Sequence, residues 1–320
     1  MSFASIKGQE NAITNLKNFI RTGKVPPAMI FYGPAGVGKA MAALSFAKAL
    51  NCQELGVDFE PCDNCLSCRQ IEAKTHPDIV FADFAYQATL LKKEEDAQQN
   101  IKIETIRALT TASQQKTVAA KWKVFIIDKA EKLGIGAANA LLKFIEEPPQ
   151  NTIWILISSK RETMLPTIKS RCQSIPFAPL SSQIIENILV DNYIESDLAH
   201  KAALYADGST ENAFLIASLL EDFAPLERDA SFATQIALNL PRTLVQARQK
   251  VNIILDMLLQ KSHQNWLEEN TEKGKKELAA LMASLGFYKR ALKQNVAPQM
   301  VAEAALVKAQ ISNINIQEIL

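Results

Sequence analysis

Residues 30–40 read Ile-Phe-Tyr-Gly-Pro-Ala-Gly-Val-Gly-Lys-Ala, and this stretch decides the fold. A short apolar strand leads into a glycine-rich turn, and helix-forming residues follow from Met41 to Leu50. The backbone N–H groups of such a turn, together with the N-terminal end of the next helix, form a cradle for phosphate. The pattern G-x-x-x-x-G-K therefore predicts a P-loop. Its nucleotide-binding residues would be Gly33, Pro34, Ala35, Gly36, Val37, Gly38 and Lys39.

The residue after the lysine departs from the P-loop pattern. A Ser or Thr hydroxyl at this position ligates magnesium, and this chain has Ala40 instead. The phosphate cradle is therefore predicted to be present without one of its metal ligands. The pattern indicates a P-loop fold but leaves nucleotide hydrolysis open, because the loop could equally be kept for its shape alone.

Length and composition limit the classes of protein to consider. A chain of 320 residues with 48% hydrophobic and 22% charged residues fits two or three globular domains. The formal net charge of +1 gives no general argument for nucleic-acid binding. Residues 2–24 predict an amphipathic helix rather than a signal peptide, and no apolar run approaches the roughly 20 residues of a membrane span. We expect a cytoplasmic protein.

Cysteines follow the P-loop helix in a pattern typical of metal binding. Three are spaced C-x2-C-x2-C, and a fourth lies ten residues upstream of them. Four thiolates satisfy tetrahedral Zn²⁺ without other ligand types, whereas disulfides are improbable in a cytoplasmic chain. The predicted structural zinc ligands are Cys52, Cys62, Cys65 and Cys68. His76 lies in a predicted turn and is left out of the site, and Cys172 is expected to be separate from it.

Apolar strands and amphipathic helices alternate as far as Phe177. Strands are expected near 79–81, 123–128 and 152–158, with helices at 103–113 and 137–145 and a last strand through Phe177. This alternation predicts a three-layer α/β domain with a mostly parallel sheet over residues 1–177. The polar stretch 83–100 is expected to be a surface excursion rather than part of the core.

The strand at 123–128 ends in a carboxylate, Asp128, as expected for the strand beside a P-loop. In working ATPases of this kind the aspartate helps to hold magnesium and a following glutamate polarises water. Lys129 occupies the glutamate position here, and we interpret it as a solvated side chain at the strand end. Basic residues nearby are interpreted in the same way, as ordinary solvated surface rather than a DNA site. They are Lys102, Arg107, Lys116, Lys121 and Lys123.

Strand patterns stop at Ser181, and helical patterns follow at 181–192, 197–206 and 210–221. Residues 222–225 form a plausible boundary, and the remainder is helical with leucine-rich apolar faces. We therefore divide the chain into a P-loop domain over 1–177 with a zinc-binding insertion at 52–68, a small helical lid domain over 178–223, and an all-α domain over 224–320.

The chain resembles the clamp-loader subunits of the AAA+ class, most closely the delta-prime branch of those in bacterial DNA polymerase III. Nearly the whole chain takes part in the resemblance, and its most specific part is the pair formed by residues 141–149 (LLKFIEEPP) and 170–172 (SRC). The other matching stretches are the P-loop, the four cysteines, Thr75–Asp78, Ala138–Lys143 and Gln294–Pro298.

The resemblance implies a subunit of a pentameric loader that uses ATP to place a sliding clamp on primed DNA. Its partners would be gamma/tau and delta subunits, with residues 224–320 forming an oligomerisation collar. The gamma/tau motor hydrolyses ATP, whereas the delta-prime type completes a neighbour's site. Three departures favour the non-hydrolysing type over the alternative, an active motor or other P-loop ATPase: Ala40, Lys129, and Glu211 at the family's sensor arginine.

The resemblance also assigns a function to Arg171. In the family the arginine of the Ser-Arg-Cys motif faces the ATP of the adjacent subunit, so Arg171 would be an arginine finger supplied in trans. A structural salt bridge or a helix C-cap is the alternative role. The resemblance leaves open whether ATP or ADP stays bound in this chain's own loop, with Asp128 beside it.

Overall fold

A computed structural model of the chain describes residues 2–94, 98, 100–226, 231–294 and 296–320. The chain forms two compact units, residues 1–180 and 181–320, which we call the N-terminal unit and the helical unit. Within the described residues, no helix combines the length and the apolar character needed to cross a membrane.

The N-terminal unit is built on a sheet of five parallel strands in the order β2-β3-β4-β1-β5. The strands are β1 (Ala28–Tyr32), β2 (Ile79–Ala82), β3 (Lys123–Ile127), β4 (Thr152–Ser158) and β5 (Gln173–Pro176). The central strands β3 and β4 are buried at every residue. Strands that are apolar at every residue need cover on both faces, as parallel sheets have. The predicted parallel sheet is confirmed.

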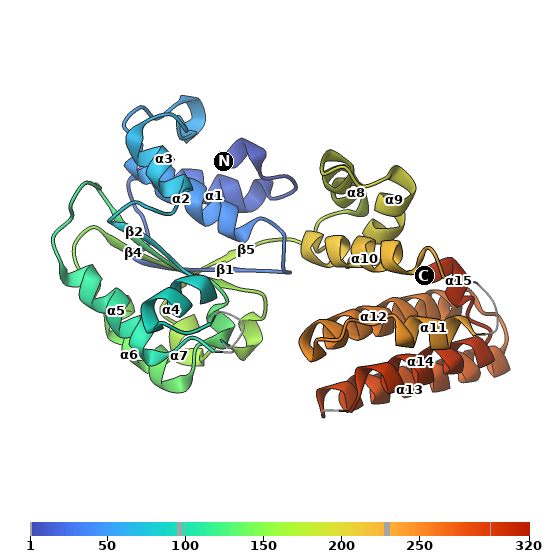
Figure 1. Cartoon of the computed structure of the whole chain (residues 1–320). Coiled ribbons are helices and arrows are strands. Elements are labelled where there is room, and N and C mark those ends of the chain that lie inside the picture. Colours follow the sequence, from blue (N-terminus) through green and yellow to red (C-terminus); the bar gives the residue numbers. More distant parts are fainter. Residues whose placement is uncertain (1, 95–97, 99, 227–230, 295) are drawn as a thin grey trace. The chain divides into compact units, whose positions relative to one another are not determined.

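Helices cover both faces of this sheet, which confirms the predicted three layers. Figure 1 shows α1 to α3 on one face and α4 to α7 on the other. They are α1 (Glu10–Thr22), α2 (Lys39–Asn51), α3 (Leu66–Glu72), α4 (Phe84–Leu91), α5 (Ile103–Gln114), α6 (Ile135–Glu146) and α7 (Pro166–Lys169). Trp154 of β4 stacks on Phe125 of β3 with ring centroids 4.6 Å apart, and both side chains lie in the core.

The leading helix is shorter than the sequence predicted. Residues 3–5 form a separate 3-10 helix, and α1 begins at Glu10 and ends at Thr22. Gly23 follows with a left-handed backbone (φ 67°) and caps the last turn. The two pieces are joined to the end of the sheet by Gln9. Its side-chain amide donates to the carbonyl oxygen of Ala178 at 2.8 Å and accepts from the Ala178 N–H at 2.9 Å.

The prediction that residues 83–100 are a surface excursion is wrong for α4. Gln87 of α4 is buried, and its side-chain oxygen accepts from the Lys102 N–H at 2.7 Å and from the Thr105 hydroxyl at 2.8 Å. Because its amide group is satisfied by neighbouring backbone and side chains, this polar residue can be buried. Residues 95–97 and 99 of this stretch lie outside the described residues.

The helical unit contains helices where the sequence predicted them. They are α8 (Ser182–Asp191), α9 (Ser196–Tyr205), α10 (Thr210–Phe223), α11 (Phe232–Leu238), α12 (Leu244–Glu268), α13 (Glu272–Lys293), α14 (Pro298–Ile311) and α15 (Ile316–Ile319). Leu255 and Leu258 of α12 and Leu281 and Leu285 of α13 are buried, as expected for apolar helix faces. Residues 227–230 and Asn295 lie outside the described residues, and the division into lid and collar at residue 223 stays a prediction.

Candidate nucleotide-binding loop and cysteine cluster

The predicted P-loop lies between β1 and α2, and two of its glycines are required by their surroundings. A Cβ on Gly33, whose φ is +150°, would lie 2.2 Å from the carbonyl oxygen of Phe177. Gly38 adopts a left-handed φ of 94° immediately before α2. Larger residues would therefore collide with the end of β5 or strain the backbone at the helix start. The loop backbone can therefore pass close to Phe177 and turn directly into α2, which is the arrangement that phosphate-binding loops need.

Lys39, the first residue of α2, is directed back over the loop. Its side-chain amine donates to the Gly33 carbonyl oxygen at 2.7 Å and to the carbonyl oxygen of Pro34. The ammonium group is buried at the mouth of the loop, where it would pair with nucleotide phosphates. Ala40 follows it and has no oxygen to ligate a metal ion.

The carboxyl end of β3 brings a second set of charged residues to the same edge of the sheet. Burial raises the pKa of Asp128, while the neighbouring Lys129 acts in the opposite direction. Lys129 is exposed and its amine lies 5.3 Å from the centre of the Phe84 ring, so the prediction of a solvated side chain is confirmed. Glu131 accepts a 2.7 Å hydrogen bond from the Ser159 hydroxyl at the end of β4.

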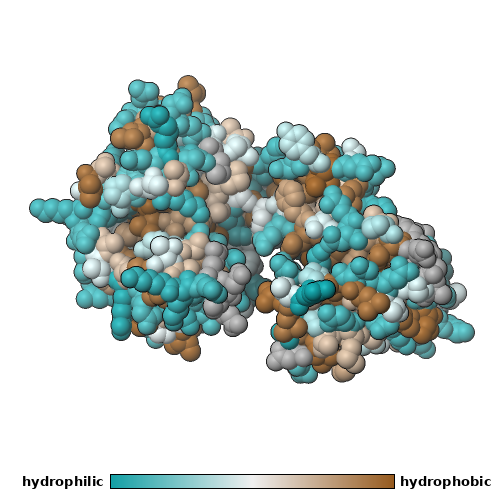
Figure 2. All heavy atoms as spheres, viewed as in Figure 1, coloured by the Kyte–Doolittle hydropathy of each residue, from teal (hydrophilic) through white to brown (hydrophobic). Residues whose placement is uncertain are grey.

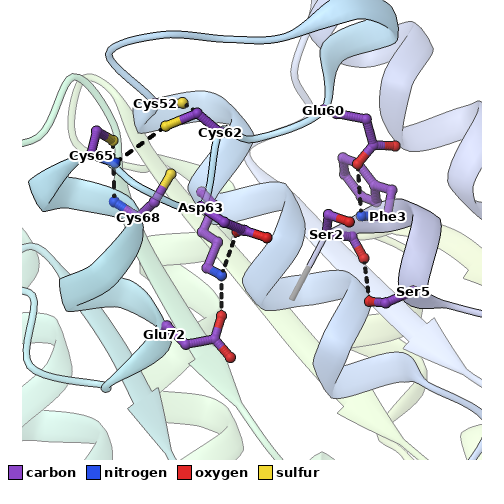
Figure 3. A network of polar contacts seen from close by, with 11 residues as sticks. Ser2, Phe3, Ser5, Cys52, Glu60, Cys62, Asp63, Cys65, Cys68 and Glu72 are labelled. Carbon is purple, nitrogen blue, oxygen red and sulfur yellow. Dashed lines mark hydrogen bonds and ion pairs between the residues drawn. The ribbon is translucent and has the colours of Figure 1, made fainter.

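The structure brings the four predicted metal ligands together. The sulfur atoms all lie within 4.8 Å of one another, and Figure 3 shows the four side chains converging at the start of α3. They are Cys52, Cys62, Cys65 and Cys68. Backbone N–H groups donate to three of these sulfurs at 3.3–3.5 Å. Such donors stabilise thiolate charge, which a metal ligand must carry.

Zinc fits this cluster by size and by chemistry. Zn–S bonds of about 2.3 Å in a tetrahedron place sulfur atoms roughly 3.8 Å apart, which is compatible with four sulfur atoms that all lie within 4.8 Å of one another. Burial alone would raise the pKa of Cys65, but hydrogen bonds from backbone N–H groups of Gln53 and Cys68 lower it to about 7. Burial raises the pKa of Cys172 to about 12, and this buried thiol belongs to the core of the sheet rather than to the cluster.

A buried lysine beside the cluster is not among the residues that the sequence predicted for the site. Lys48 of α2 is buried, and its amine lies 2.9 Å from a carboxylate oxygen of Asp63 and is ion-paired with Glu72 of α3. Lys48 interrupts a largely apolar stretch of α2. Because a lysine is rarely buried without carboxylates, this position in the sequence could have indicated a buried ion pair. These two ion pairs connect α2, which begins at the P-loop, to α3 and to Asp63 in the loop that carries the cysteines.

The other predicted residues lie in several places. Arg171 follows Ser170, the residue that caps α7. Glu211 is exposed in the first turn of α10, where an acid is favoured by the helix dipole. The interpretation of Lys123 as solvated surface is wrong. Lys123 is buried, and its amine donates to the carbonyl oxygens of Ala112 at 2.8 Å and Gln115 at 2.5 Å. The amine therefore caps the carboxyl end of α5.

Comparison with known proteins identifies the family. The family model described as "DNA polymerase III, delta subunit" matches residues 8–181. The tau subunit of DNA polymerase III from Bacillus subtilis is 36% identical over 217 residues, which are 66% of this chain and 36% of tau. The delta' subunit from the same organism is 36% identical over 200 residues, which are 62% of this chain and 55% of delta'. The chain thus matches less than two thirds of either relative.

The fold is also found in a solved structure. A DNA polymerase III gamma subunit-related protein from Thermotoga maritima has a TM-score of 0.54 and 16% identity, with 94% of this chain and 99% of that chain covered. This likeness concerns the fold alone. The family model, by contrast, matches more than half of the residues, and the chain therefore belongs to the DNA polymerase III delta subunit family.

Proposed function

We propose that this chain is the non-hydrolysing, delta-prime type of clamp-loader subunit. The observation that carries the proposal is a complete phosphate cradle followed by Ala40, where a magnesium-ligating hydroxyl is needed for hydrolysis. Overall similarity does not separate this type from the motor, since tau and delta' of Bacillus subtilis are equally identical to the chain. The proposal therefore rests on the individual residues at the site.

Two further residues support the same choice. Lys129 stands where a motor needs a glutamate to polarise water, and its amine faces the Phe84 ring instead. Glu211 stands where the family has a phosphate-facing arginine. Loss of a metal ligand, a water polariser and a cation removes three parts on which phosphoryl transfer depends. ATP or ADP would still be held through Lys39 and the loop N–H groups, with Asp128 nearby.

Arg171 is the residue that we propose acts on another subunit. It lies at the surface after α7, and a guanidinium offers forked donors that match phosphate oxygens. In an assembled loader it would reach the ATP of the adjacent subunit and stabilise charge in the transition state. The structural zinc at the four cysteines would fix the adjoining loop and take no part in that reaction.

Assembly is proposed to use residues 224–320, which belong to the helical unit. Its helix α14 exposes Met300, Val307 and Ile311, which lie at helical positions i, i+7 and i+11 and therefore on one face. Figure 2 shows apolar residues at the surface of this unit among hydrophilic ones. We propose that this face meets gamma/tau or delta subunits in a pentamer that loads the sliding clamp on primed DNA in the cytoplasm.

ATP hydrolysis by the purified full-length chain tests the proposed type. The expected rate is the background rate, equal to that of Lys39→Ala, and Ala40→Thr alone is expected to leave it there because Lys129 and Glu211 remain. Nucleotide binding is measured in the same samples, so that a silent but folded loop is distinguished from a damaged one. Turnover by the wild-type chain that Lys39→Ala abolishes would favour the motor.

A further inference from the structure

The segment before α1 is joined to the loop that carries the cysteines. The backbone N–H of Phe3 donates to a carboxylate oxygen of Glu60 at 3.0 Å, and Figure 3 shows Glu60 facing Phe3. Lys17 of α1 lies 2.8 Å from Glu60 and 2.6 Å from Asp58. The side chains of Lys17 and Glu60 are only 16% and 25% exposed, so this pair is better shielded than a typical surface salt bridge.

The same segment also packs against the P-loop. Phe3 is 1% exposed and Ile6 is 7% exposed. A methyl group of Ile6 lies 3.0 Å from the position that a Cβ on Gly38 would take, so Ile6 occupies the space beside this glycine of the loop. Residues 3–6 therefore lie between the phosphate loop, beside Ile6, and the loop that carries the cysteines, where Glu60 contacts Phe3.

The cysteine loop between Cys52 and Cys62 has little regular structure of its own. It contains one short 3-10 turn, and Asp58 and Phe59 have left-handed φ angles of 56° and 60°. Left-handed backbone at residues other than glycine costs free energy, and it persists when the surroundings hold it in place. The loop is held in part by its own hydrogen bond from the Gly56 N–H to the Glu60 carbonyl oxygen at 2.8 Å. The cysteines at both ends of the loop and Lys17, which pairs with Asp58 and Glu60, add to this.

We infer that metal binding by the four cysteines holds residues 3–6 against the P-loop, with Glu60 and Lys17 as the connection. The inference rests on the proposed zinc site and goes beyond a purely local structural role for it. A metal ion closes the loop at Cys52 and Cys62, and this keeps Glu60 where it accepts from Phe3 and pairs with Lys17. Without the ion, the loop conformation and both contacts would be lost together.

Hydrogen exchange of the full-length chain tests this connection. The metal-loaded protein is compared with the same protein after removal of zinc by a chelator, and bound metal is measured in each sample. Removal is expected to speed amide exchange in residues 2–22 by roughly tenfold, because these amides then open locally rather than globally. Exchange in α12 and α13 of the helical unit is expected to stay unchanged and serves as the internal control.

A variant separates the connection from general damage to the cluster. Lys17→Met keeps the apolar stem but removes both ion pairs, so it is expected to retain full metal content and still show the faster exchange in residues 2–22. Lys24→Met, which changes an exposed lysine after α1, is the matched control. The inference is overturned if zinc removal affects residues 52–68 only, or if fully loaded Lys17→Met exchanges like the wild type. A failure of the zinc proposal itself would be seen separately, as absence of bound metal.

Discussion

Arg171, the residue after α7 and its cap, is ion-paired with Glu146, the last residue of α6. Its guanidinium also donates to the Thr167 carbonyl oxygen at 3.2 Å. The two paired side chains are 40% and 46% exposed, and surface pairs of this kind contribute about 0–1 kcal/mol to stability. The fold therefore does not depend on this pair, and Arg171 can exchange Glu146 for a phosphate at small cost.

The first prediction concerns the metal. Protein purified without added zinc is expected to hold one zinc ion per chain, and Cys65→Ser is expected to lose it, because three thiolates no longer complete the tetrahedron. Cys172→Ser is the matched control and should keep its zinc, since Cys172 lies in the core apart from the cluster. Metal analysis by mass spectrometry decides the point. A metal content near zero in the wild type, or unchanged in Cys65→Ser, would contradict the zinc assignment.

The second prediction concerns the buried Asp78, which accepts hydrogen bonds at 2.8–3.0 Å from the N–H groups of Val118, Ala119 and Ala120. Burial opposes ionisation, but these donors hold the pKa of Asp78 below its ordinary value of 3.8. A carboxylate with a lowered folded-state pKa adds stability above its ordinary pKa, and this stability is lost as pH falls through the folded-state value.

Asp78→Asn is therefore expected to lower the free energy of unfolding at pH 7 by about 2 kcal/mol. The difference from the wild type should begin to shrink as pH falls below the ordinary value of 3.8, where the unfolded carboxyl is protonated, and should go on shrinking as pH falls through the lower folded-state pKa. Urea unfolding at several pH values measures both effects, with Glu162→Gln as a control at an exposed carboxylate. A constant difference across this pH range would show that the ionised carboxylate is not the source of the stability.

Much of the fold follows from local patterns in the sequence. The strands around β3 and β4 are continuous apolar runs, and the P-loop and cysteine spacings are short motifs whose geometry is set by neighbouring residues. Both the parallel sheet and the convergence of the four cysteines could therefore be predicted. The leading helix was extended too far because the amphipathic pattern does not reveal that residues 3–5 form a separate turn.

Long-range polar contacts could not be predicted in the same way. Lys123 was assigned to the surface by its charge, but carbonyl groups at the end of α5 satisfy it in the interior. Gln87 was placed in a surface excursion, although partners more than ten residues away bury it. The contact between Lys17 and Glu60 joins residues that only the fold brings together. The hydrophobic periodicity of a sequence indicates which faces of its helices and strands are apolar. It does not indicate which buried polar side chains have hydrogen-bond partners in the fold.

The third prediction concerns assembly. Met300→Glu combined with Ile311→Glu places charge on the exposed face of α14 and is expected to prevent incorporation into a loader reconstituted with gamma/tau and delta subunits. Val245→Glu, at an exposed apolar position of α12, is the control and should assemble normally. Gel filtration of the mixture separates the two results, and circular dichroism checks that both variants are folded. Normal incorporation of the α14 variant would exclude this face from the interface.

The most direct test of the central claim is ATP hydrolysis by a reconstituted loader in the presence of clamp and primed DNA. Arg171→Ala and Arg171→Lys are each compared with the wild type, and Glu146→Gln serves as the control that breaks the same ion pair from the other side. If Arg171 acts in trans, both arginine variants assemble normally and lose hydrolysis at one ATP site, so that the total rate falls in part, while Glu146→Gln retains the wild-type rate. If the arginine variants assemble and every site turns over at the wild-type rate, Arg171 is structural and the account of this subunit as a partner in its neighbour's catalysis is wrong.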